Sequence, residues 1–284
     1  MKNNIFKIAI ITVSMLAVTQ APAGAVSITP SNNATAMANS ILGTWGTLVG
    51  TPTLVASYES DNTAPSAGFF SDGLSSGLDF NSGVVLSSGD IRLIPGPNSS
   101  IETSTVLGLP GDTQLQALVS DMPNSDKTYD VTALTFDFIT GGGSLYFNFI
   151  FGSEEYNEMV NEINDVCAIF LDNQNIALVP GTTSPVSIYN VNNSKNSAYY
   201  VDNTSGLFNI ELDGLTTGLT SSVINLNEGI HTIKFAIADE GDGDLDSALF
   251  IRSGVFSPTP APEPSSMILG LMGLASIIGL KKKD

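Results

Sequence analysis

The chain has 284 residues, with 10 Lys and Arg against 28 Asp and Glu, which gives a formal net charge of −18 at pH 7. Such an acidic surface repels nucleic-acid phosphates and anionic membranes, which excludes nucleic-acid binding, and it attracts divalent cations or cationic partners. The single cysteine, Cys167, excludes an internal disulfide and lies in an apolar run, so we expect it in the core.

The first 25 residues have the three parts of a secretory signal peptide. Lys2 and Lys7 give a basic start, residues 8–18 are apolar, and small residues follow up to Ala25. We expect cleavage after Ala25, with Ala23 as the second choice. A retained membrane anchor is the alternative, but the apolar run is too short to span a bilayer.

Residues 26–257 are predicted to form one all-β domain. Apolar and polar residues alternate with period two in many segments, which is typical of half-buried strands. The roughly 230 residues between the two ends are enough for one β-sandwich with a core of its own. We therefore predict a two-sheet sandwich of jelly-roll type with one or two short helices.

The helices are expected at residues 33–42 and 112–119, the second with Asp112 as its N-cap. Residues 134–138 and 145–151 alternate most clearly and are joined by three glycines, so we expect them to pair as a hairpin. The other predicted strands are 78–87, 165–171, 176–179, 207–212, 219–226, 230–238 and 248–256.

The C-terminal end has the composition of a sorting tail. Residues 258–264 are a Pro-rich linker, residues 265–280 are apolar, and three lysines follow. As a helix the apolar stretch would be about 24 Å long, which only marginally spans a ~30 Å hydrocarbon core. The lysines would stay on the cytoplasmic side and leave the β domain outside.

This tail resembles the PEP-CTERM sorting signal through Pro262, Glu263 and Pro264, the apolar stretch and the basic terminus. Members of that family usually end in arginines, whereas this chain ends in lysines and Asp284. The resemblance implies an exosortase-type processing enzyme as a partner, and residues 265–284 as a transmembrane sorting tail. It also implies a Gram-negative bacterium that makes exopolysaccharide. An ordinary C-terminal membrane anchor is the alternative.

Carboxylates concentrate in residues 239–247, between two predicted strands. Ca²⁺ prefers six to eight oxygen ligands, which an acidic loop can supply. Asp242, Asp244 and Asp246 have the spacing that opens an EF-hand loop, but position twelve is Ser253 instead of Glu, so an EF-hand is excluded. By itself this stretch supports a solvated acidic turn equally well.

A second acidic stretch favours a metal site. Glu154 and Glu155 follow one predicted strand and Asp165 opens the next, so these groups lie at strand ends where distant loops can meet. Clustered carboxylates repel one another unless a cation or protons neutralise them. The predicted ligands of a Ca²⁺ ion are Asp239, Asp242, Asp246, Glu155 and Asp165.

Several motifs of the β domain resemble the choice-of-anchor L family. In chain order they are Ser82 to Asp90, Gly96 to Asn98, Phe151 to Tyr156, Asn164 to Val166, Asn175 to Thr182, and Ala238 to Ala248. Members of this family carry different surface anchors, PEP-CTERM among them, so the resemblance implies a surface location and agrees with the tail. Cys167 stands where an aromatic or small residue is more usual.

Catalytic signatures are scarce: the single His231 is expected on a strand surface, and there is no Gly-x-Ser-x-Gly elbow or zinc-spaced set. The leading hypothesis is a non-enzymatic surface or matrix protein associated with exopolysaccharide or biofilm, with a structural calcium ion. A carbohydrate-binding adhesin is the alternative. A glycoside hydrolase using Glu154 and Glu155 ranks third, because adjacent strand residues point to opposite faces. Candidate sugar-stacking residues are Trp45, Tyr156, Tyr189, Tyr199 and Tyr200.

Overall fold

The computed structural model describes residues 24–58, 64–120 and 127–254. The predicted signal peptide lies outside the described residues apart from its last two, and so do the linker with Pro262, Glu263 and Pro264 and the whole tail. Within the described ranges, no helix has both the length and the apolar character needed to cross a membrane.

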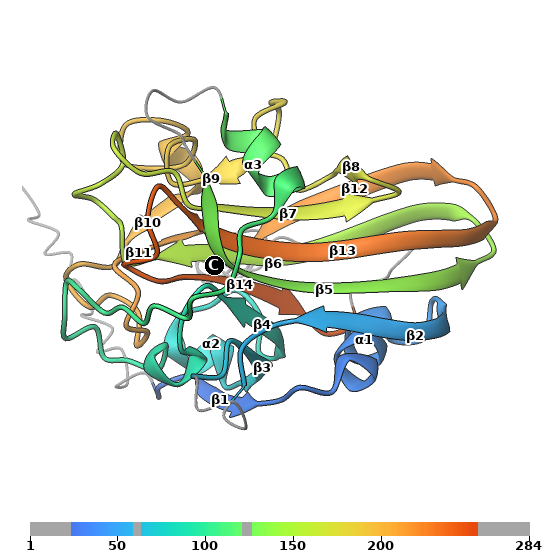
Figure 1. The fold of residues 1–284 in the computed structure, drawn as a ribbon, viewed down its shortest axis with the longest axis horizontal. Coiled ribbons are helices and arrows are strands. Elements are labelled where there is room, and N and C mark those ends of the chain that lie inside the picture. Colours follow the sequence, from blue (N-terminus) through green and yellow to red (C-terminus); the bar gives the residue numbers. More distant parts are fainter. Residues whose placement is uncertain (1–23, 59–63, 121–126, 255–284) are drawn as a thin grey trace, which may run out of the picture.

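Two antiparallel sheets face each other, which confirms the predicted all-β sandwich (Figure 1). Sheet A has the order β1 (Ser27–Pro30), β3 (Ala67–Ser71), β4 (Gly83–Ser87), β14 (Ser247–Arg252), β6 (Gly143–Ser153), β11 (Gly214–Thr216) and β10 (Tyr200–Asp202), and β12 (Leu219–Leu226) also pairs with β6. Sheet B has the order β2 (Thr47–Val55), β5 (Thr128–Thr140), β13 (Gly229–Glu240), β7 (Val166–Leu171) and β8 (Gln174–Asn175), and β9 (Val186–Ser187) also pairs with β7.

The two predicted helices are confirmed and begin at local capping signals. α1 (Ala34–Leu42) is capped by Asn33, whose side chain accepts a hydrogen bond from the backbone N–H of Ala36. α3 (Thr113–Val119) is capped by Asp112. A third helix, α2 (Gly73–Ser76), and the 3₁₀ turns η2 (Ile91–Leu93) and η3 (Ser197–Tyr199) complete the elements.

The predicted hairpin of residues 134–138 and 145–151 is wrong. These segments belong to β5 and β6, which lie in different sheets: β5 pairs with β2 and β13, and β6 with β14, β11 and β12. The apolar faces of both strands point into the space between the sheets. Period-two alternation identifies the buried face of a strand but not the neighbour with which it pairs.

Other strand predictions have mixed outcomes. Strands are confirmed at 165–171, 219–226 and 230–238 and over part of 78–87 and 248–256. The strands that were missed are β1, β2, β3 and the short β8, β9, β10 and β11. Residues 207–212 are not a strand and make only one isolated bridge, at Ile210. The amide of Asn203 instead donates to the carbonyls of Ile210 and Leu212, which satisfies buried backbone oxygens without a ladder. Residues 176–179 likewise make only a bridge, at Leu178.

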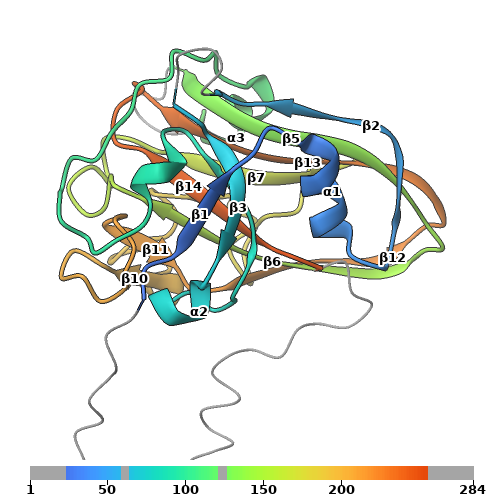
Figure 2. The same ribbon diagram turned by 90° about the horizontal axis from the view of Figure 1, so that it is seen from below.

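Apolar side chains fill three layers. The main core lies between the sheets and includes the buried Cys167, as predicted. A second layer covers the outer face of sheet A. Figure 2 shows β1 and β3, the strands at one edge of this sheet, and α2, which follows β3. A third layer lies between sheet B and α3. Strands β7, β13 and β14 are therefore buried on both faces over most of their length.

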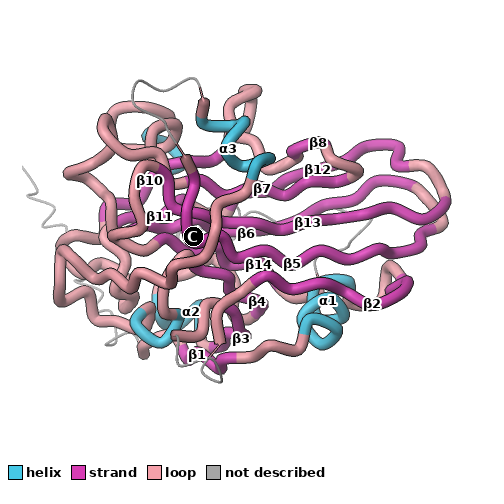
Figure 3. The backbone as a smooth tube through the Cα atoms, viewed as in Figure 1, coloured by secondary structure: helices cyan, strands magenta, loops and turns pink. Residues whose placement is uncertain are grey.

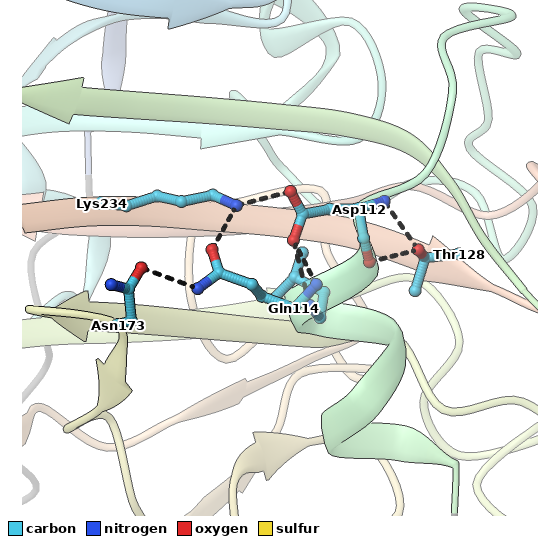
Figure 4. A network of polar contacts seen from close by, with 6 residues as sticks. Asp112, Gln114, Thr128, Asn173 and Lys234 are labelled. Carbon is cyan, nitrogen blue, oxygen red and sulfur yellow. Dashed lines mark hydrogen bonds and ion pairs between the residues drawn. The ribbon is translucent and has the colours of Figure 1, made fainter.

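A polar network attaches α3 to sheet B (Figure 4). The Asp112 carboxylate accepts hydrogen bonds from the backbone N–H groups of Gln114 and Leu115, at 3.0 and 3.1 Å. Lys234 on β13 donates to Asp112 and to the side-chain oxygen of Gln114. The N-terminal turn of α3 is thus bound to the strand beneath it.

The loops gather at one end of the sandwich, on the left in Figure 3. Here β13 of sheet B passes into β14 of sheet A through residues 241–246. The opposite end consists mainly of the extended β5, β13, β6 and β12. The loop end is where the acidic residues meet.

Candidate cation site at the loop end of the sandwich

Strand register brings four acidic segments together at this end. Ser247 pairs with Ser153, so the start of β14 lies beside the end of β6. Ala238 pairs with Val166, so the end of β13 lies beside the start of β7. The residues next to these pairs are Glu154, Glu155, Asp165, Asp239 and Asp246, and all five are buried.

Three of these residues, Glu155, Asp165 and Asp239, form what we call the inner acidic cluster. Asp165 accepts hydrogen bonds from the Ser247 hydroxyl at 2.6 Å and from the backbone N–H of Glu240 at 3.0 Å. Asp239 is 1% exposed, and neither of its carboxylate oxygens has a hydrogen-bond partner of normal geometry in the described part of the chain. One oxygen of Glu155 is in the same state. The Ser88 hydroxyl lies close enough to favour the charged form of Asp239 slightly, and Asp239 does the same for Asp165.

Burial disfavours the charged form of every member of this cluster. Loss of solvation, reinforced by the charge of Asp165, raises the pKa of Glu155 to about 10 and raises that of Asp239 well above its ordinary value. Burial also raises the pKa of Asp165 to about 7, although its hydrogen bonds from Ser247 and Glu240 oppose the shift. Protons or a cation must therefore neutralise the inner acidic cluster.

Glu154 points to a different group of acids. A small pocket, partly open to solvent, is lined by Ser87, Asp90, Leu93, Ile94, Thr103, Glu154, Leu212 and Asp246. We call it the outer acidic pocket. Glu154 is 1% exposed, and both its carboxylate oxygens lack a hydrogen bond of normal geometry from any described residue. The backbone N–H of Thr103 lies close enough only to favour the charged form slightly.

The carboxyl groups of this pocket also favour the neutral form. Burial, followed by the charges of Asp213, Glu211 and Asp246, raises the pKa of Glu154 to about 9. Burial raises the pKa of Asp246 to about 7, against the hydrogen bond that its carboxylate accepts from the Thr105 N–H at 2.9 Å. In both acidic regions, burial and neighbouring negative charge therefore disfavour the ionised carboxyl groups. Both regions lie at the same end of β6.

The structure does not gather all five predicted ligands into one group. Asp246 lines the outer acidic pocket, and Asp242 is exposed on the loop, where its carboxylate accepts a hydrogen bond from the Asp244 N–H at 3.0 Å. Among the described residues, no three His, Cys, Asp or Glu side chains are arranged to hold a metal ion. Binding of one Ca²⁺ by the whole predicted set stays a prediction.

Sequence reasoning did not select Glu154, Asp213 or Glu211 as metal ligands, and named Glu154 only in the acidic stretch and as a hydrolase candidate. All three are buried, and Glu211 and Asp213 lie in or directly after residues 207–212, which were predicted to be a strand but form a loop. The available signal for Glu154 was its position shortly after the predicted strand, beside Glu155. Its neighbours in space come from the loop before β11, a proximity that no local pattern carries.

The aromatic residues proposed for sugar stacking are largely occupied by packing. Tyr156 is fully buried, and its hydroxyl donates to the Val191 carbonyl at 2.7 Å. Trp45, Tyr199 and Tyr200 are partly buried against the main core. The ring of Tyr189 faces the Lys195 ammonium at 4.0 Å. Tyr156 therefore offers no stacking face to a ligand.

His231 lies on β13, as predicted, beside the acidic residue Asp172 rather than near the acidic end. Its Nδ1 is 2.7 Å from the Asp172 carboxylate, and its Nε2 is 3.0 Å from the Asn227 carbonyl. Both contacts suit a doubly protonated ring, since neither partner can donate. His231 thus closes the turn between β12 and β13.

These features define a two-sheet β domain whose loop end contains buried, uncompensated carboxyl groups. The family model of the choice-of-anchor L domain matches residues 27–257. The chain belongs to this family, as its sequence motifs indicated. Membership implies a protein that is exported or held at the cell surface.

A search of curated proteins finds no match to this chain. Similar solved structures include two of the β-glucosidase from Kluyveromyces marxianus, one Se-Met labelled and one in complex with glucose, both 11% identical to this chain. The matches cover 55% and 51% of this chain but only 14% and 12% of the enzyme chains, with TM-scores of 0.23 and 0.22. A similarity this low carries no argument about fold or activity.

Proposed function

We propose that this chain is an exported, non-enzymatic protein of the cell surface or extracellular matrix, associated with exopolysaccharide in biofilms. Family membership supports the location, and the signal-like N-terminus and the tail support the route. An exosortase-type enzyme would process the tail near Pro262, Glu263 and Pro264. The role of the β domain would be structural, with calcium as its stabilising ion.

The observation that carries the calcium proposal is the state of Asp239. Its carboxyl group is buried, neither oxygen has a hydrogen bond of normal geometry within the described residues, and Asp165 is close enough for the two charges to oppose each other. Burying one uncompensated ion costs several kcal/mol, and a divalent cation can compensate two carboxylates at once. Asp165 and Asp239 would be the direct carboxylate ligands, and Glu155 and Asp242 would add negative charge nearby.

An ion at this place would hold the two sheets together. Asp165 precedes β7 and Asp239 lies on β13, both in sheet B, while the Ser247 hydroxyl that donates to Asp165 belongs to β14 in sheet A. Calcium binding would therefore stabilise the crossing from one sheet to the other. At a calcium concentration one hundred times Kd the gain would be about 2.7 kcal/mol. For a domain of this size, that gain corresponds to a rise in Tm of roughly 5–10 °C.

The test is thermal unfolding and calorimetric titration of the purified full chain after chelation. We expect Ca²⁺ to raise Tm and to bind saturably. Asp239→Asn should remove the part of both effects that the inner acidic cluster supplies. The matched control is Asp137→Asn, which removes the same charge towards the far end of β5. No change in Tm and no heat of binding with the unmodified chain would overturn the calcium proposal.

A further inference from the structure

We propose that the outer acidic pocket is a second cation site, in which Glu154 and Asp246 bind a hard divalent ion of the calcium class. The site lies close enough to the inner acidic cluster for the charge of Asp246 to act on Asp239, but its carboxylates line a different space. Its main residue, Glu154, is not a member of the inner acidic cluster.

The first observation is geometric. Glu154 and Asp246 both line the pocket, and the backbone N–H of Glu154 donates to the Asp246 carbonyl at 3.1 Å, so the two residues are fixed relative to each other. Asp246 is also held against the backbone at Gly89, where an added Cβ would lie 1.8 Å from its carboxylate. The pocket therefore contains two carboxylates in a defined position.

The second observation is that Glu154 has no compensating group of its own. It is 1% exposed and lines the pocket, with both oxygens unpartnered among the described residues. The neighbouring acids are better satisfied. Glu211 accepts hydrogen bonds from the backbone N–H of Ser100 at 2.8 Å and from the Thr103 hydroxyl at 3.2 Å. Asp213 accepts one from the Asn98 amide at 2.7 Å.

The nearby positive charge of Arg92 is already paired with another acid. Arg92 donates to both oxygens of Asp90, at 2.9 and 3.0 Å from Nε and 2.7 Å from the terminal nitrogen. The other ion pairs in the described part of the chain join His231 and Lys234 to acids elsewhere. Glu154 and Asp246 are thus left with mutual repulsion inside a low-dielectric pocket.

The donors select the class of ion. The polar side chains of the pocket supply carboxylate and hydroxyl oxygens, with no imidazole or thiolate in the lining. Oxygen donors favour Ca²⁺ or Mg²⁺, whereas zinc and copper favour nitrogen and sulfur. Two carboxylates cannot fill a calcium shell of six to eight oxygens, so carbonyl groups and water would complete it.

Such an ion would fix the long loop between η2 and α3. The Asp246 carboxylate already accepts from the Thr105 N–H, and the Asp246 N–H donates to the Thr103 carbonyl at 3.4 Å. An ion bound by Asp246 and Glu154 would connect this loop to β6. Ions in both acidic regions would then stabilise the sheet crossing and the loop that covers it.

The experiment is calcium stoichiometry of the purified full chain, measured by native mass spectrometry and equilibrium dialysis with Ca²⁺ alone. We expect two ions for the unmodified chain and one for Glu154→Gln, with the remaining ion lost when Asp239→Asn is added. Gln keeps the shape of the side chain, so circular dichroism should be unchanged. The matched control is Glu102→Gln, which removes an exposed charge from the loop between η2 and α3 and should keep both ions.

Each other outcome separates the two sites. If Glu154→Gln binds as many ions as the unmodified chain, Glu154 is simply protonated and the second site is overturned. If the unmodified chain binds one ion that is lost with Glu154→Gln but kept with Asp239→Asn, the outer site stands and the inner one fails. If the unmodified chain binds no calcium, both fail.

Discussion

Glu154 and Glu155 are adjacent in the chain and both are buried, yet their charges act on separate groups of acids. Glu155 faces Asp165, while Glu154 faces Asp213 and Glu211. Both residues follow Ser153, the last residue of β6, and Glu154 lines the outer acidic pocket whereas Glu155 does not. One strand end thus supplies negative charge to two acidic regions.

The two groups of acids predict separate but coupled effects on stability. Glu154→Gln and Asp239→Asn should each remove part of the calcium-induced rise in the free energy of unfolding. In the double variant the loss should differ from the sum of the two single losses by about 0.5–3 kcal/mol, because the charge of Asp246 acts on Asp239. Denaturant unfolding of the unmodified chain, the two single variants and the double variant, each with calcium and with chelator, measures these losses. A single shared ion would instead make the second substitution nearly silent after the first.

The sheet-to-sheet packing predicts a large cost for one core substitution. Phe147 of β6 and Phe235 of β13 are fully buried, and their rings meet edge-on across the sandwich with centroids 6.1 Å apart. Phe147→Ala should cost about 3–5 kcal/mol and lower Tm by roughly 10 °C. Ile224→Ala on β12 is the control, because Ile224 is 57% exposed and its loss should change stability by less than about 0.5 kcal/mol. Similar Tm values for the two variants would contradict this packing.

The helices and the buried faces of the strands could be predicted because their signals are local. Asn33 and Asp112 are caps that bond to groups two or three residues away, and the inward row of β6 is visible in the sequence alone. The pairing of β5 with β13 joins residues about one hundred positions apart, as in Leu134 and Phe235. Such contacts depend on the whole sandwich and leave no local pattern.

The candidate site was predictable to the same degree. Asp165 and Asp239 were selected because acids at strand ends can meet, and the structure brings them together. Asp242 was included only for its spacing, and a turn leaves it exposed. Glu154 was not selected as a metal ligand, because the residues around it lie in the loops of Glu211 and Thr103, whose positions are set by tertiary contacts.

The cap of α3 predicts a moderate loss of stability. Asp112→Ala removes two bonds to backbone N–H groups and the partner of Lys234, so we expect a loss of about 1–2 kcal/mol. Glu102→Ala is the control, because it removes a carboxylate that is exposed on the loop before α3. Chemical unfolding should distinguish the two variants. Equal losses would show that the network in Figure 4 contributes little.

The His231–Asp172 pair predicts a pH-dependent contribution to stability. Partial burial lowers the pKa of His231, but the hydrogen bonds to Asp172 and to the Asn227 carbonyl outweigh this effect and leave the pKa raised. The folded protein therefore holds this proton more tightly than the unfolded chain does. The contribution is complete below the unfolded pKa of about 6.5 and is lost as pH rises through the folded pKa.

His231→Gln should accordingly reduce stability more at about pH 5.5 than at pH 8.5, by up to about 1 kcal/mol for a pair that is partly exposed to solvent. The groups packed around the ring are Asp172, the Asn227 carbonyl and Phe138, with Asp137 bound to the neighbouring Thr232. Buried carboxyls titrate in both proteins, so their effect cancels in the difference. An equal loss of stability at both pH values would show that protonation of His231 does not contribute to stability.

The proposed sorting route makes a prediction in cells. Replacing Pro262, Glu263 and Pro264 together by alanine should leave export intact but prevent processing, because the enzyme would no longer find its motif beside the apolar stretch. Mass spectrometry of the C-terminal peptide and fractionation of cells measure this directly. We expect the unmodified protein to lose its terminal lysines and the variant to keep them in the membrane fraction. Lys281→Arg preserves the positive charge and should be processed normally, and normal processing of the alanine variant would overturn the assignment of the motif.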